Sequence, residues 1–517
     1  MSKPPVLSTF ASAQETATRW VRESSFYRTV PVYYKNFYQR LLRYWIDWYD
    51  GYVEQVHGRQ DGVMSTRIAA TIVQGAARKI LRGGILFENA DIPTLTDEEG
   101  VGKALSFISD KWAKDADFEA TVEEAICDAF AGGTAFVKLN ASLSRGIWLD
   151  VYRADRAFAT FNASGRVEYF RGFLNEYMKD GDGENAYTLV EERYFKDLPI
   201  RKHVPVSVIS VHRSTMTAPD NYSTAKCDWR DLPRGIRDKI KEDYGSILVG
   251  QERALPWSDH LGVEAFKNTR RIASLPGIEY GESLLANILS YMFSYDYYFS
   301  CLNTDMYLGR GRAVVPKGLA NPKAKGQEYN AGLDSFLFTK VEYQTTEDKK
   351  IEPLQFALRS AEWREIRNNL IESMAFATGL SVGTIASFLN DQSNRTAREV
   401  SSEESATQEF CEAKRRQFTA PINRLLALVC DYYGFIDRVV VRWSRAGMTN
   451  ETTRTENALA KYRDGAASLD TTLRELYPDM DEYQRRKECE EIGKETAAKQ
   501  AAGMAMFGDL GGATTVM

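Results

Sequence analysis

The sequence has few of the residues on which many enzymes and secreted proteins depend. Only four of its 517 residues are histidines, and no H-E-x-x-H pair occurs. The six cysteines are scattered without a C-x-x-C pair, which disfavours a zinc site or a small disulfide framework. The opening stretch MSKPPVLSTF lacks the apolar run of a signal peptide. We therefore expect reduced thiols in a cytosolic setting.

Motifs of nucleotide and metal chemistry are also missing. No G-x-x-x-x-G-K-[ST] loop occurs, and Gly309 and Gly311 lack the third glycine of a dinucleotide fingerprint. Acidic pairs such as Glu123–Glu124 are adjacent in the chain, so on a helix they point about 100° apart and cannot share one metal ion. We expect no enzymatic activity, no catalytic residue, no metal site and no cofactor.

Excess positive charge is absent as well. The net charge is −5 and the isoelectric point is about 5.7, which argues against a protein that coats nucleic acid. It does not exclude a protein that handles DNA without gripping it. A chain of this length exceeds one hydrophobic core, so two or more domains are expected.

The periodicity of apolar residues changes along the first half of the chain. Helical spacing over 63–82 ends at Gly83, and one or two further helices are expected within 100–131. From 134 to 212 the apolar residues alternate between turn signals, which predicts antiparallel strands. The expected class is α+β, mainly helical, with helices first and a strand meander after them.

A second region begins with a helix that is apolar on nearly every side, over 279–309. Glu282, Asn287 and Asp296 within it disfavour a membrane span. A helix of this kind must be buried on most sides, so we expect neighbouring subunits to cover it.

A short β-rich insert and two more helices follow this helix. The insert carries strand-like pieces around 313–315, 336–341 and 351–358, and a helix with an apolar stripe covers 359–379. After the polar run NDQSNR, Thr396 and Glu399 fit a capping box that opens a helix reaching Tyr433. Pro421 within that helix predicts a kink.

The order of these pieces resembles the portal proteins of tailed bacteriophages, especially those of long-tailed phages. The segments TGLS and NRTAREVSSEES, the stretch VEEAICDAFAGGTAFVKLN and the terminal SLDTTLRELYPDMDEYQRRKECEEI are similar to that family's motifs. The resemblance implies the portal fold and divides the chain in sequence order. Its parts are a wing (1–278), a stem helix (279–303), a clip (304–358), a second stem helix (359–379), a tunnel loop with a kinked helix and a wing strand (380–450), and a helical crown with a flexible tail (451–517).

The same resemblance implies a ring of about twelve copies at one capsid vertex, through which double-stranded DNA is packaged and ejected without sequence specificity. Implied partners are the terminase large subunit, the major capsid and scaffolding proteins, and the head-completion or adaptor proteins, with no membrane. Assembly would take place in the host cytoplasm and the product would be part of the virion. The tunnel loop would consist of Asn390, Asp391, Gln392, Ser393, Asn394 and Arg395, and the stem residues facing the channel would be Arg364, Asn368 and Glu372.

The tunnel segment holds no lysine, so a cationic grip on DNA is not expected there. Short, nearly neutral side chains exchange hydrogen bonds easily, whereas rings of basic residues would bind phosphates tightly. Two alternatives stay open: another head or connector protein of a phage, which would lack the stem–clip–stem order, and a DNA-processing enzyme, which would need a metal site that the sequence does not reveal.

Overall fold

The computed structural model describes most of the chain between residues 32 and 494. The described residues are 32–52, 63–90, 103–142, 146–178, 185–197, 202–218, 221–244, 249–257, 259–272, 275, 278–308, 312–316, 338–341, 352–354, 360–389, 397–444, 451–477, 480, 485 and 487–494.

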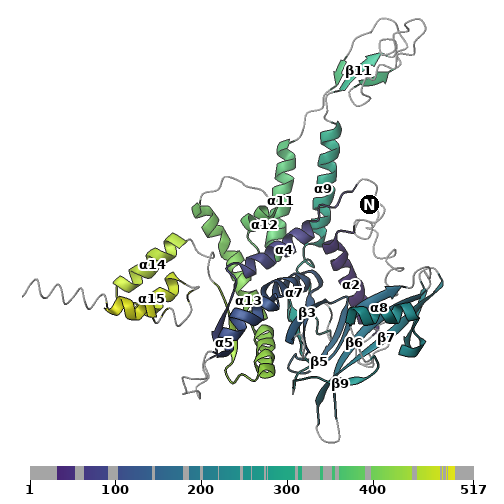
Figure 1. Ribbon diagram of the computed structural model, residues 1–517. Helices are drawn as coiled ribbons and strands as arrows, with labels where there is room; N and C mark the ends of the chain where they lie inside the picture. The colour runs from purple at the N-terminus through teal and green to yellow at the C-terminus, as the bar shows by residue number, and fades with distance from the viewer. Residues whose placement is uncertain are drawn as a thin grey trace, which may run out of the picture.

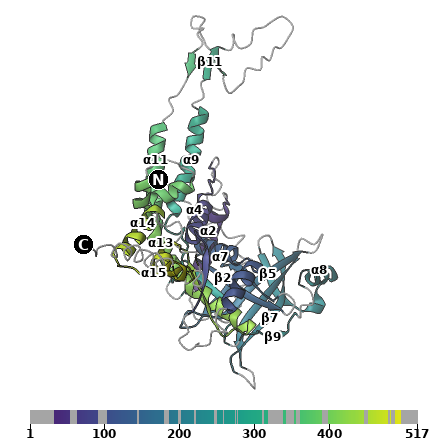
Figure 2. The same cartoon turned by 60° about the vertical axis from the view of Figure 1, so that its left-hand side comes forward.

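Helices occur throughout the described chain. Two of them, α9 and α11, lie side by side and extend away from the body (Figures 1 and 2). The helices are α2 Val32–Asp50, α4 Ile68–Leu81, α5 Lys103–Phe107, the π-helix η2 Ile108–Trp112, α6 Ala113–Asp115, α7 Phe118–Gly132, the 3-10 turn η3 Trp229–Asp231, α8 Arg234–Tyr244, α9 Leu289–Leu308, α11 Ser360–Thr378, α12 Val382–Phe388, α13 Ala397–Tyr433, α14 Glu451–Arg463 and α15 Leu469–Leu476.

The predicted meander is present but is divided between two sheets. A three-stranded sheet has the order β10-β2-β3, and a larger sheet has the order β4-β5-β6-β7-β8 with β9 beside β7. A third, two-stranded sheet pairs β1 with β14 antiparallel. The strands are β1 Ile85–Asn89, β2 Thr134–Ser142, β3 Gly146–Arg153, β4 Ala157–Phe161, β5 Val167–Met178, β6 Asn185–Lys196, β7 Val204–Ala218, β8 Asn221–Cys227, β9 Glu252–Ala254, β10 Val263–Lys267, β11 Arg312–Pro316, β12 Phe338–Val341, β13 Glu352–Leu354 and β14 Val439–Trp443.

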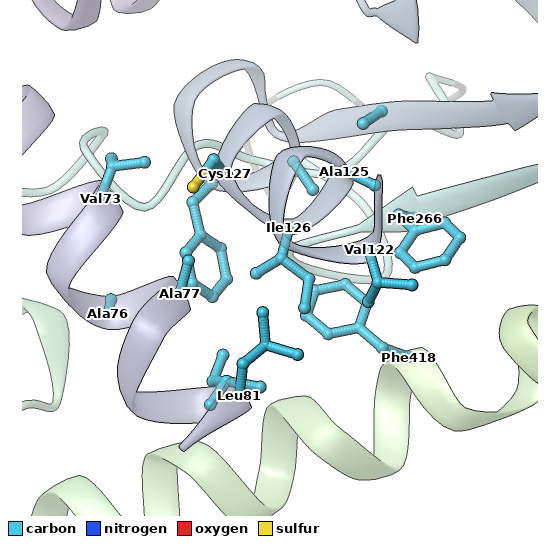
Figure 3. Close-up of a cluster of buried hydrophobic side chains, with 14 of the residues drawn as sticks. Val73, Ala76, Ala77, Leu81, Val122, Ala125, Ile126, Cys127, Phe266 and Phe418 are labelled. Atoms are coloured by element: carbon cyan, nitrogen blue, oxygen red, sulfur yellow. The ribbon is translucent and has the colours of Figure 1, made fainter. Parts of the chain in front are cut away.

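The largest core forms where α4, α7, β10 and α13 meet (Figure 3). Small residues of α4, such as Ala76 and Ala77, face Ile126 of α7, while Phe266 of β10 stacks on Phe418 of α13 with ring centroids 5.7 Å apart. Burial of aliphatic and aromatic side chains contributes roughly 1.5–3 kcal/mol for each large residue. This core fixes α13 relative to the N-terminal helices.

Buried charges connect the two larger sheets. Lys138 of β2 donates to Glu191 of β6 at 2.8 Å, and Arg193 of β6 donates to the same carboxylate at 2.7 Å. Arg193 also donates to the carbonyls of Leu139 and Leu261, so its guanidinium is satisfied on several sides. Burial alone would raise the pKa of Glu191, but Arg193 and Lys138 hold it well below its usual value.

The helix predicted over 279–309 begins later than the prediction, since α9 runs from Leu289 to Leu308, and it extends past the implied stem boundary at 303. The prediction of helix before Leu289 is wrong because this stretch is held against the end of α7. Ser283 Oγ donates to the carbonyls of Phe130 and Ala131, at 2.9 and 2.7 Å. Backbone contact there is so close that a Cβ on Gly281 would lie 2.3 Å from the Gly133 carbonyl oxygen.

Other predicted elements agree closely with the structure. The second long helix, predicted over 359–379, is α11, and the helix predicted from 397 to Tyr433 is the 37-residue α13. Pro421 lies inside α13, and the kink stays a prediction. Thr396 and the side chain of Glu399 lie outside the described residues, so the capping box is also untested. Three strands, β11, β12 and β13, form a small sheet in the predicted insert.

A helical hairpin, α14 and α15, follows β14 and lies apart from the body in Figure 1. Ser468 caps α15, because its Oγ accepts a hydrogen bond from the Thr471 amide at 3.2 Å. The tail from 495 onward lies outside the described residues.

Candidate subunit-contact and channel surface

The helix pair formed by α9 and α11 is joined by aromatic and polar contacts. Trp363 of α11 donates from Nε1 to Asp305 of α9 at 3.0 Å, and its ring meets Tyr298 edge-on with centroids 5.4 Å apart. Burial raises the pKa of the Tyr298 hydroxyl. Beyond the pair lies the small sheet around β11 (Figures 1 and 2).

The middle of α9 is tied to the segment that precedes α4. Asp296, which is buried, accepts from the amide and the hydroxyl of Thr66, at 2.9 and 2.6 Å. Ser300 accepts from the Met64 amide at 2.9 Å. Asp296 therefore has a structural partner inside the same chain, which explains a carboxylate within an apolar helix.

One face of the first half of α9 is covered by its own chain. Ile288, which precedes the helix, is buried, and so are Met292 and Tyr295 within it. The expectation that neighbouring copies cover the helix is therefore wrong for the face that carries these residues. The sequence could not reveal this, because the cover comes from segments distant in the chain.

From Tyr297 onward α9 keeps large apolar side chains exposed, and so does α11. Phe376 of α11 is 93% exposed, which is exceptional for a phenylalanine. We call this set of six residues the bare apolar surface: Tyr297, Phe299, Met306 and Tyr307 of α9, with Ile366 and Phe376 of α11.

The candidate channel residues of the stem lie on one stripe of α11. Arg364, Asn368 and Glu372 are all exposed and follow each other at a spacing of four, which places them on the same face of the helix. Phe376, four residues after Glu372, is rotated by about 120° around the helix from Arg364, so it lies at the side of this face. Sequence reasoning missed this phenylalanine, because only the structure shows that none of the described residues covers it.

The predicted tunnel residues Asn390, Asp391, Gln392, Ser393, Asn394 and Arg395 lie outside the described residues. The helices on either side of them are described, and a buried cluster of three hydroxyl groups joins these helices. Thr407 of α13 accepts from the Ser381 amide at 2.9 Å, and its Oγ1 lies 2.9 Å from Thr384 Oγ1. Ser381 Oγ donates to Thr384 Oγ1 at 2.8 Å and accepts from Thr407 at 3.0 Å. We call these three residues the hydroxyl cluster.

The end of α12 also packs closely against α4. The ring of Phe388 lies over Gly75, and a Cβ at that glycine would be 2.7 Å from two ring carbons. A glycine within a helix costs about 1 kcal/mol relative to alanine, so its presence here is explained by the close approach of the ring. The chain is therefore packed against α4 two residues before Asn390.

Two basic residues of α13, the buried Arg415 and the half-buried Lys414, donate to carbonyl oxygens. Arg415 donates to the carbonyls of Ile80 and Ser444, at 2.8 and 2.9 Å, and its guanidinium lies 5.7 Å from the ring centroid of Trp443. Burial lowers the pKa of Lys414 to about 8, and its Nζ donates to the Asn268 carbonyl at 2.5 Å. These side chains hold α13 in place, because both are directed inward.

Within the described residues, no group of three or more His, Cys, Asp or Glu side chains is arranged to hold a metal ion. No single described helix is long and apolar enough to cross a membrane, and Ala361–Thr378 with Val382–Phe388 meet that test only as a pair bent by 114°.

Comparison with known proteins gives one family and a set of solved structures. A chain described as "Neck of empty GTA particle computed with C6 symmetry" has 11% sequence identity and a TM-score of 0.42, with 83% of this chain and 93% of that chain covered. No curated protein sequence matches. Residues 257–502, which include the helix pair, the small sheet and α13, match the family described as "Phage portal protein, SPP1 Gp6-like", so the resemblance to portal proteins is confirmed over this part of the chain.

Proposed function

We propose that this protein is the subunit of a phage portal, a ring with a central channel through which double-stranded DNA enters and leaves the capsid. The family match over 257–502 supports this proposal. The structural observation that carries it is the bare apolar surface on a helix pair that stands away from the body.

Exposed apolar side chains in this number favour burial against another protein chain. Burying a large apolar side chain contributes roughly 1.5–3 kcal/mol, so the six residues of this surface favour association. A ring uses head-to-tail contacts, in which one side of the pair in each copy meets the other side in the next. The helix pair has apolar residues on both helices, as such a contact requires.

In this assignment α9 and α11 form the stem, and the small sheet around β11 belongs to the clip, where the terminase large subunit and later the adaptor proteins dock. The sheets and α13 form the wing, and α14 with α15 belong to the crown. Arg364, Asn368 and Glu372 line the stem channel, with the polar segment 390–395 at its narrowest point. The mixed charge of these residues suits passage of DNA rather than retention.

Electron microscopy of the purified protein tests the assembly directly. We expect rings with a central hole, and a preparation that remains monomeric at high concentration contradicts the proposal. Tyr297→Asp places a charge on the bare apolar surface and should shift rings toward monomers. Ile436→Asp is the matched control: Ile436 is 75% exposed and lies just after the C-terminal end of α13, so this change should leave the rings intact.

DNA passage is tested separately from assembly. Replacing Asn390–Asn394 by lysines should leave rings countable in the microscope but arrest packaging of DNA in a reconstituted motor assay. Rings that package DNA normally after this change would remove the channel assignment of the segment. An absence of packaging with the unchanged protein, despite normal rings, would favour a different connector role.

A further inference from the structure

A cluster of carboxyl groups lies where α2 meets the body, far along the chain from the helix pair. We call it the α2 cluster. From α2 it contains Asp47 and Asp50, from α7 it contains Glu124 and Asp128, and Asp155 follows β3. Arg43 of α2 and Arg153 of β3 are its cations.

The two arginines are already engaged by particular carboxylates. Arg153 lies 3.0 Å from Asp50 Oδ1 and 2.9 Å from Asp155 Oδ1, so it ties α2 to the end of β3. Arg43 Nε lies 3.0 Å from Asp47 Oδ1, within the same helix. With every carboxyl ionised, five negative groups would face these two cations, a surplus of three negative charges.

Asp47 is the most enclosed member of the cluster. Its side chain is fully buried, and apart from the Arg43 ion pair neither carboxylate oxygen receives a hydrogen bond from the described residues. A buried carboxylate without hydrogen-bond donors is costly in its charged form. Burial, opposed by Arg43 and reinforced by Asp50 and Asp155, raises the pKa of Asp47 to about 6.

Asp128 lies on α7, the helix against which α2 packs, and the charges of Arg153, Asp155 and Asp50 act on it. Burial raises the pKa of Asp128 to about 7, while Arg153 lowers it and Glu124, Asp155 and Asp50 raise it. Cys127 beside it has its pKa raised to about 12 by burial, with Glu123 and Asp128 adding to the rise and Arg78 of α4 opposing it, so the thiol stays neutral. Burial likewise raises the pKa of Tyr49, on α2, so its hydroxyl also stays neutral.

We propose that the α2 cluster is a pH-sensitive clasp, which holds α2 firmly when Asp47 and Asp128 are neutral and loosens when both ionise. When Asp128 ionises it repels Asp50 and Asp155 and competes for Arg153, the cation that ties α2 to β3. Apolar contacts, such as those of Leu42 and Ile46 near Gly132, keep α2 in place at either pH. Ionisation of the cluster therefore makes local opening of α2 more frequent, but it does not detach α2 from the body.

The sign of the effect follows from the direction of the shifts. A carboxyl group with a raised pKa in the folded state stabilises the fold at low pH, and this contribution is lost as pH rises through 6 and 7. The proposal is independent of the portal assignment, since it concerns only the attachment of α2.

Hydrogen exchange followed by mass spectrometry on the full chain tests the clasp. Between pH 5.5 and pH 8, after correction for intrinsic exchange rates, opening of α2 should increase about tenfold or more, the effect of one unit of pKa shift or greater. Asp128→Asn and Asp47→Asn each mimic the neutral acid, so each should make the opening of α2 less dependent on pH. Asp115→Asn changes an exposed aspartate of α6 and should behave as the unchanged protein.

Two outcomes would overturn the proposal. One is the same pH dependence in the unchanged protein and in both asparagine variants. The other is protection of α2 that increases as pH rises. If one variant folds poorly, the other still gives the comparison.

Discussion

The ring of Phe388 occupies the space that a Cβ on Gly75 would need, with two ring carbons 2.7 Å from that position. This contact joins the last turn of α12 to the middle of α4. It lies two residues before the segment proposed to line the narrowest part of the channel. A glycine that looks like a helix defect in the sequence is therefore a packing surface.

Gly75→Ala should destabilise the protein, although alanine is the better helix former. Real Cβ atoms are essentially never found closer than 3.0 Å to another heavy atom, so Phe388 must move. Overpacking of this kind costs about 1–3 kcal/mol, which outweighs the gain of about 1 kcal/mol in helix propensity. Denaturant unfolding measures the change.

Gly235→Ala provides the matched control, because that helical glycine has nothing within 4 Å of its Cβ position. It should be neutral or mildly stabilising. If Gly75→Ala behaves in the same way, the close approach of Phe388 has no energetic consequence. Adding Phe388→Ala should remove the clash, at the cost of a small cavity.

Much of the secondary structure could be predicted because its signals are local. Helical spacing and the glycine that ends it predicted both ends of α11 to within one residue. The helical run up to Tyr433 predicted the bounds of α13. The start of α9 could not be predicted, since Ser283 and its neighbours bind the end of α7, about 150 residues earlier. Leucine periodicity alone does not distinguish such a tethered segment from a helix.

The site was less accessible to sequence reasoning than the fold. Arg364, Asn368 and Glu372 share a stripe, as their spacing requires, but the exposure of Phe376 depends on the position of every neighbouring segment. The division of the meander into two sheets was also missed, because Glu191 and Lys138 are 53 residues apart in the chain and nothing local marks their pairing.

Thr407→Val should weaken the hydroxyl cluster without changing its volume. The valine cannot accept the Ser381 amide hydrogen bond, so a buried donor is left without its partner. The expected loss is about 1–3 kcal/mol of unfolding free energy. Thr121→Val is the control, since the hydroxyl of Thr121 bonds the Asp117 carbonyl at an exposed position and should change stability little. Equal effects of the two changes would contradict the structural role of the cluster.

Arg415→Lys should be more harmful than its preserved charge suggests. The guanidinium donates to carbonyls at the end of α4 and to Ser444, and a lysine cannot reproduce this planar set of donors. Loss of charge-assisted hydrogen bonds costs about 1.5–3 kcal/mol for each bond. Arg416→Lys changes the next residue, whose side chain is 80% exposed and pairs with Glu412 at 3.7 Å, and should be nearly neutral. Thermal unfolding of both variants gives the comparison, and similar midpoints would refute the anchoring role of Arg415.

Glu191→Gln should destabilise the fold at neutral pH and matter progressively less in acid. The change leaves Lys138 and Arg193 buried without their carboxylate, and breaking a buried ion pair in this way costs about 3–5 kcal/mol. Because the pKa of Glu191 is lowered in the folded state, its contribution is present above the unfolded value, near 4.5, and is lost as pH falls toward the folded value. The difference in unfolding free energy between the unchanged protein and the variant, measured from pH 7 to pH 3, should therefore shrink.

Glu168→Gln alters an exposed residue of β5 and should give a small difference at every pH. A Glu191→Gln difference that is equally small would mean that this ion pair does not hold the two sheets together.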